Sequence, residues 1–77
     1  MEPGREIVLG IDPGTAVTGY GVVAREGGGA VVLVECGVIR TSSGRPLAER
    51  IREIFAEVDG LILRFQPSSL AVEEVRR

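Results

Sequence analysis

The sequence predicts an α/β fold in which three strands, one helix and a fourth strand follow one another. Three observations support this order. First, three runs of β-forming residues, separated by glycine-containing turns, fill the first half of the chain. Second, apolar residues recur every three or four residues after Pro46. Third, a short apolar run follows near the end of the chain. We expect an antiparallel meander of three strands and a crossover helix that returns the fourth strand parallel to one of them. At 77 residues the chain forms one domain at most, with a thin core.

The three strands of the meander are bounded by turn-forming residues. The first is expected over Glu6–Asp12, where apolar residues are nearly unbroken and Pro13-Gly14 ends the run. The second is expected over Thr18–Arg25. A run of three glycines then provides a turn, and the third strand is expected over Ala30–Thr41.

An amphipathic helix is expected after Pro46, because proline suits the first turn of a helix. Its apolar residues recur on one face and are Leu47, Ile51, Ile54, Phe55, Val58, Leu61, Ile62 and Phe65. The acidic row Glu49, Glu53 and Glu57 is interpreted as a solvated surface. Pro67 is expected to end the helix, and Leu70–Val75 is expected to form the fourth strand.

Composition limits the classes of function. The net charge is −2 and all nine basic residues are arginines, so a DNA-binding surface would have to be local or lie elsewhere. No apolar run is long enough to span a membrane, and the start does not resemble a secretory signal. The single cysteine, Cys36, permits no internal disulfide, which is consistent with the cytoplasm, and we expect it to be buried.

Two carboxylates are the candidate catalytic and metal-ligating residues. Asp12 and Glu73 each stand at the end of an apolar strand. If the fourth strand pairs in parallel with the first, both acids reach the same end of the sheet, and side-chain alternation can place them on one face. Neighbouring carboxylates repel unless a cation lies between them, and magnesium suits such a pair. Glu74 points to the opposite face in a regular strand and is interpreted as structural.

Other chemistries have weaker support. The turn Gly10–Thr15 could cradle a phosphate through backbone N–H groups, but the standard nucleotide-binding motifs are absent. The chain contains no histidine, which excludes histidine-dependent triads and histidine-based zinc sites within it.

Several stretches resemble one known family. Leu9–Val22 reads L-G-I-D-P-G-T-A-V-T-G-Y-G-V, and it resembles the opening signature of the RuvC family of crossover junction endodeoxyribonucleases. Gly37–Thr41 resembles the third strand of that family. Arg64–Pro67 and Leu70–Val75 resemble its helix exit and fourth strand. These stretches are collinear and span nearly the whole chain, and the D-P-G-x-x-x-T-G-Y-G part is the most specific.

The resemblance implies an RNase H-like fold and places two of the family's metal ligands on Asp12 and Glu73. It implies an endonuclease that resolves Holliday junctions in DNA recombination and repair by magnesium-dependent phosphodiester hydrolysis, with two ions per complete site. It also implies a homodimer that binds a four-way DNA junction, with the branch-migration proteins RuvA and RuvB as further partners.

Relative to that family, residues 1–77 correspond to the N-terminal portion of a single RNase H-like nuclease domain, and the C-terminal portion is absent. The family has two later aspartates that find no match, so we expect these 77 residues alone to lack a complete active site. The fourth strand would then be a bare sheet edge. We therefore expect the chain alone to self-associate.

Three other functions remain open at this point. One is a nuclease of the same fold that resembles the YqgF or RuvX group and acts on ribosomal RNA precursors. Another is an ATP-binding module of the actin and sugar-kinase type, and the third is a partner-binding fragment without catalysis. The sequence also leaves open whether Arg40, Arg45 or Arg64 contacts DNA.

Overall fold

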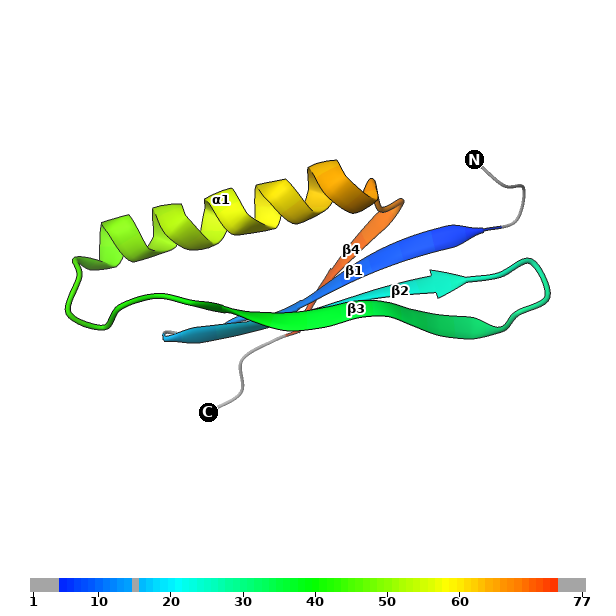
Figure 1. The fold of residues 1–77 in the computed structure, drawn as a ribbon, viewed down its shortest axis with the longest axis horizontal. Coiled ribbons are helices and arrows are strands. Elements are labelled where there is room, and N and C mark those ends of the chain that lie inside the picture. The colour runs from blue at the N-terminus through cyan, green and yellow to red at the C-terminus, as the bar shows by residue number, and fades with distance from the viewer. Residues whose placement is uncertain (1–4, 15, 74–77) are drawn as a thin grey trace.

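The computed structural model describes residues 5–14 and 16–73. Their secondary structure runs in the order β1 (Glu6–Asp12), β2 (Val17–Arg25), β3 (Val31–Arg40), α1 (Leu47–Phe65) and β4 (Ser69–Val72), as Figure 1 shows. This order confirms the predicted β-β-β-α-β arrangement, and the bounds differ from the predicted ones by a residue at some ends.

The predicted fourth strand differs most from the structure. It begins one residue earlier than expected and its regular part ends at Val72. The predicted members Glu74 and Val75 lie outside the described residues.

The strands form one mixed sheet in the order β3-β2-β1-β4. β1 pairs with β2 and β2 pairs with β3 in antiparallel fashion, which confirms the meander, and the second of these pairings contains a bulge between Val22 and Val23. β4 pairs with β1 in parallel, so that Leu70 lies beside Leu9. The helical crossover therefore returns the chain to the first strand, and β4 forms one edge of the sheet within the described residues.

The buried core lies on one face of the sheet. Leu9 and Val22 are register partners with no exposed surface, and Ile39 is 6% exposed beside the buried Thr18. α1 lies over this side (Figure 1), which we call the helix face; the opposite side is the open face. No described residue of α1 is fully buried, and Phe55 is 73% exposed. The described residues therefore form only a small buried core, as expected for a short chain.

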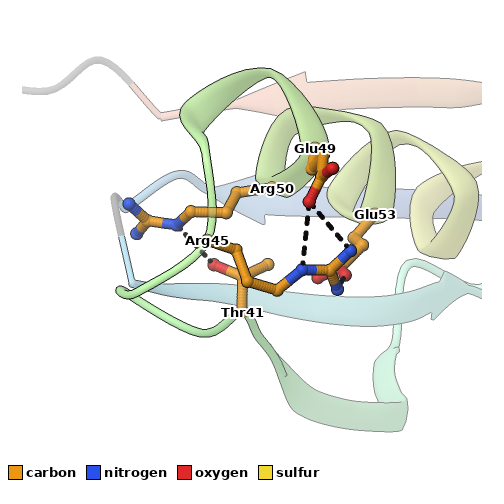
Figure 2. A network of polar contacts seen from close by, with 5 residues as sticks. All are labelled: Thr41, Arg45, Glu49, Arg50 and Glu53. Carbon is orange, nitrogen blue, oxygen red and sulfur yellow. Dashed lines mark hydrogen bonds and ion pairs between the residues drawn. The ribbon is translucent and has the colours of Figure 1, made fainter.

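Figure 2 shows the polar contacts at the start of α1. Arg45 forms ion pairs with Glu49 and Glu53, and Nε of Arg50 donates a hydrogen bond to Oγ1 of Thr41 at 3.2 Å. These contacts fasten the first turns of the helix to the chain that leaves β3. They also show that two members of the acidic row have an arginine partner.

Backbone geometry ends α1 just before Pro67. Gln66 has a left-handed conformation with φ 47°, and its N–H donates to the Ile62 carbonyl at 2.8 Å. Proline disfavours a helical conformation in the residue before it, which is why the helix stops here. Gly60, which lowers helix propensity, does not interrupt the helix.

A network of three side chains joins α1 to the sheet. The Tyr20 hydroxyl on β2 donates to Oε2 of Glu35 on β3 at 2.8 Å, and Nη2 of Arg64 on α1 lies 3.1 Å from Oε1 of Glu35. The hydrogen bond to Glu35, with burial and the nearby negative charge, raises the pKa of the Tyr20 phenol above its usual range. The Tyr20 ring occupies the space over Gly37, where an added Cβ would lie 2.8 Å from the hydroxyl oxygen.

The prediction that Cys36 is buried is wrong, because its side chain is exposed. Its register partner is Gly21, next to the buried Val22, so alternation places Cys36 on the open face. Nothing in the described chain covers that face of β3. Within the part of the chain that the structure describes, no helix combines the length and hydropathy needed to cross a bilayer.

Candidate metal centre

Asp12 is the last residue of β1 and its side chain is exposed. Its antiparallel partner is Gly19, and a Cβ added to that glycine would lie 3.7 Å from the Asp12 Cβ. Because Gly19 is next in sequence to the buried Thr18 of the helix face, alternation places Gly19 and Asp12 on the open face. The aspartate therefore stands on a surface without a neighbouring side chain across the strand pair.

Glu73 directly follows β4, and the parallel ladder continues through its backbone. Val72 is the partner of Ile11, and the Glu73 N–H donates to the Ile11 carbonyl at 2.9 Å. Glu73 is thus the next residue along the ladder beside Asp12. Paired residues of neighbouring strands share a face, so both carboxylates lie on the open face. The structure brings together the two residues that the sequence singled out.

The chain that leaves Asp12 is held by a buried threonine. The Thr18 hydroxyl, 2% exposed, donates to the Gly14 carbonyl at 3.4 Å and accepts from the Gly14 N–H at 3.5 Å. A Cβ on Gly14 would collide with the Val17 carbonyl, so only glycine fits there. The Thr41 N–H also donates to the Ala16 carbonyl at 3.2 Å. These bonds tie the turn after Asp12 to the beginning of β2 and the end of β3.

Sequence reasoning missed this supporting role of Thr18. The sequence marks Thr18 only as the first residue of the second strand and as part of the T-G-Y-G signature, although a threonine in an otherwise apolar strand is a signal for a buried hydrogen bond. The alternative interpretation of Gly10–Thr15 as a phosphate-binding turn finds little support in its described part, Gly10–Gly14, and Thr15 lies outside the described residues. Gly10 lies within β1 opposite Gly21, and the turn leads into a strand rather than into the N-terminus of a helix.

The two carboxylates can bind a hard divalent cation. Neighbouring strands lie about 5 Å apart, which is close enough for one ion to bridge two carboxylates. The described residues contain no group of three or more histidine, cysteine, aspartate or glutamate side chains that could hold a metal. Magnesium commonly takes one or two carboxylates and completes its shell with water and phosphate oxygens, so this pair fits it. Glu74 lies outside the described residues.

Residues 8–76 match the model of a family described as crossover junction endodeoxyribonuclease RuvC. Over 69 residues the chain is 48% identical to the protein of that name from Pelotomaculum thermopropionicum, a match that covers 90% of this chain and 42% of the relative. It is 45% identical over 69 residues to the one from Alkaliphilus metalliredigens, with the same shares covered. The chain spans about two fifths of the length of these relatives.

Solved structures resemble the fold closely. The structure of Thermus thermophilus RuvC in complex with Holliday junction substrate superposes with a TM-score of 0.81 at 41% identity, over 92% of this chain and 45% of that one. A member of the Ppx/GppA family from Aquifex aeolicus superposes with a TM-score of 0.70 at 18% identity, over 88% of this chain and 25% of that one. The second likeness shows a shared fold alone.

Proposed function

Because this chain belongs to the RuvC family of crossover junction endodeoxyribonucleases, we propose that the protein resolves Holliday junctions in DNA recombination and repair as a structure-selective endonuclease. The observation that carries this proposal is that Asp12 and Glu73 occupy neighbouring positions at the ends of β1 and β4, with the Glu73 N–H bonded to the Ile11 carbonyl. Two acids at adjacent strand ends can contribute ligands to the divalent cations on which metal-dependent phosphodiester hydrolysis depends.

In this proposal Asp12 and Glu73 are the ligands that this chain contributes to a magnesium site, with two ions in the complete site. Bound magnesium supplies a Lewis acid for the phosphate oxygens and for the attacking water. Asp12 is held by its strand and by the Thr18 bonds to the following turn, and Glu73 is held by the ladder bond to Ile11. Both carboxylates are therefore preorganised by backbone structure, which is how such sites gain precision.

Gly19 shapes the approach to the carboxylates. It presents no side chain across from Asp12, so a phosphodiester can come close to the sheet surface at this point. An exposed site on an uncovered sheet face suits a large substrate such as a DNA junction better than it suits a small molecule, which is usually enclosed in a pocket.

The proposal extends to the assembly. Residues 1–77 form the N-terminal portion of one RNase H-like nuclease domain, whose remaining carboxylates come from outside this chain. The working protein is a homodimer on a four-way DNA junction in the cytoplasm, and RuvA and RuvB are its branch-migration partners. The family match favours this function over a YqgF/RuvX-like nuclease and over an ATP-binding module.

The test is cleavage of a labelled synthetic four-way junction by the full-length protein with magnesium. We expect two symmetric nicks, which disappear in the Asp12→Asn and Glu73→Gln variants and persist in Glu57→Gln, a control that removes an exposed helix carboxylate. Nicking that survives both site substitutions would contradict the assignment of the metal ligands. Absence of junction cleavage by the unaltered protein would contradict the proposed function.

A further inference from the structure

The three arginines that the sequence leaves open as DNA contacts differ in their partners. The Arg45 side chain, which precedes α1, extends along the first turns of the helix and forms ion pairs with Glu49 and Glu53, as Figure 2 shows. Arg64 lies 3.1 Å from Glu35 on the helix face. A phosphate that recruited either arginine would have to displace carboxylates that already hold it.

Arg40 is in a different situation. It is the last residue of β3, its side chain is exposed, and it forms no hydrogen bond or ion pair through that side chain with any residue the structure describes. The preceding Ile39 is buried on the helix face at 6% exposure. Alternation therefore places the Arg40 side chain on the open face, where Asp12 and Glu73 also lie.

The sheet register fixes where Arg40 stands relative to the carboxylates. Asp12 pairs with Gly19, and Gly19 pairs with Val38, which forms one row across β1, β2 and β3. Arg40 is two residues beyond Val38 on the same face. With strands about 5 Å apart and a rise of about 3.3 Å per residue, the Cα atoms of Asp12 and Arg40 are roughly 12 Å apart.

The surface beside Asp12 is low. Gly10, Gly19 and Gly21 lie on the open face of β1 and β2 and carry no side chains, so the backbone itself forms the floor beside Asp12. A DNA strand can come close to the sheet beside Asp12, and on its way to Arg40 it passes the exposed side chains of Val17 and Val38, which lie on the same face. When one phosphodiester of the DNA strand lies at Asp12 and Glu73, another phosphate a few nucleotides along the same strand is within reach of Arg40 on the edge strand β3.

We propose that Arg40 is a positioning residue that binds a backbone phosphate of the DNA strand whose phosphodiester lies at Asp12 and Glu73. The inference rests on the proposed function and specifies how that site holds its substrate. The guanidinium supplies a permanent positive charge with paired donors that match phosphate oxygens. It also gives the open face a local basic group in a chain whose net charge is −2, as sequence composition demands of a DNA-binding surface.

The test measures equilibrium binding of the full-length protein to a labelled synthetic four-way DNA junction, with calcium in place of magnesium to slow hydrolysis, over a series of salt concentrations. Variants are Arg40→Gln, Arg40→Lys and the control Arg52→Gln, which removes an exposed arginine of α1. We expect Arg40→Gln to weaken binding about five- to tenfold near 0.1 M salt and to reduce the slope of log affinity against log salt by about one. Arg40→Lys should retain the slope, and Arg52→Gln should match the unaltered protein.

The salt slope separates a phosphate contact from a structural role, because a variant that only folds less well has fewer active molecules, and these keep the salt slope of the unaltered protein. If Arg40→Gln and Arg52→Gln show the same affinity and slope while the unaltered protein binds the junction, the role of Arg40 is overturned and the proposed function stands. If the unaltered protein does not prefer the junction to a linear duplex, the proposed function fails, and the role of Arg40 fails with it.

Discussion

Asp12 ends β1 and Glu73 directly follows the adjacent parallel strand β4, and the Glu73 N–H donates to the carbonyl of Ile11 at 2.9 Å, one residue before Asp12. The backbone thus fixes the position of both acids at one end of the sheet. Like charges on neighbouring strands oppose folding unless something neutralises them. The pair therefore has a stability cost in the absence of a cation, and that cost can be measured.

Substitution of Asp12 by asparagine should stabilise the metal-free protein. We expect the free energy of unfolding to rise by a few tenths of a kcal/mol in denaturant titrations with a chelator, because one cross-strand repulsion is removed. With magnesium present the order should reverse, since the unaltered protein binds the cation more tightly than Asp12→Asn and gains more binding free energy. Glu57→Gln is the matched control, and an equal response of both variants to magnesium would contradict this account.

The space over Gly37 should be intolerant of a side chain. An added Cβ would lie 2.8–3.0 Å from atoms of the Tyr20 side chain, so Gly37→Ala should displace the ring and destabilise the protein by about 1–3 kcal/mol. Gly21→Ala is the control, because an added Cβ there meets nothing within 4 Å. Thermal unfolding compares the two, and equal midpoints would show that the ring does not need the space.

The ionisation of Tyr20 should report the network that joins α1 to the sheet. Tyr20 is the only tyrosine, so absorbance near the phenolate band follows it alone. Its pKa is raised chiefly by the hydrogen bond to Glu35, whereas the charge of Arg64 lowers it. Glu35→Ala should therefore lower the midpoint and Arg64→Ala should raise it. Shifts of the same sign in both variants would contradict the observed geometry.

The sign of the linked stability follows from the raised pKa of Tyr20. The folded state holds the phenol proton more tightly than the unfolded state, so the contribution to stability is complete below about pH 10 and is lost as the pH rises through the folded-state pKa. Tyr20→Phe should remove this part of the alkaline loss of stability. Denaturant titrations on either side of that pH provide the comparison.

Exposed apolar side chains should make the 77-residue chain self-associate. Phe55 is 73% exposed on α1, and Leu70 is 51% exposed on the edge strand β4. We expect sedimentation coefficients that rise with concentration, and a shift toward the monomer in Phe55→Glu. Ala56→Glu introduces the same charge beside the apolar stripe and should change association less. A compact monomer at all concentrations would refute the expectation.

The placement of Asp12 and Glu73 could be predicted because it depends on general rules. A helical crossover makes the fourth strand parallel to the third, and in a three-stranded meander the first strand runs in the same direction as the third. Acids at the ends of the first and fourth strands therefore reach the same end of the sheet, and side-chain alternation can place them on one face. The ligand role of these residues stays a prediction. The RNase H-like architecture followed from the family signature, and the β-β-β-α-β order followed from apolar periodicity together with the glycine and proline residues that bound the elements.

Contacts that depend on register could not be predicted. The bond between Tyr20 and Glu35 requires the pairing of β2 with β3, including its bulge, and the Arg64 contact requires the rotation of α1 about its axis. Cys36 was mispredicted for a related reason: an apolar run resembles a buried strand, but one face of β3 is uncovered. The face occupied by Arg40 likewise follows from register and not from composition.

Titration of manganese, as a paramagnetic substitute for magnesium, into the isotopically labelled chain tests the central claim most directly. If Asp12 and Glu73 together bind the cation, amide signals of Gly19 and neighbouring residues should broaden first, and Asp12→Asn and Glu73→Gln should each weaken binding at least about tenfold, since each removes one of two protein ligands. Glu57→Gln should bind like the unaltered chain. Broadening centred elsewhere, or affinity unchanged by both site substitutions, would contradict the assignment.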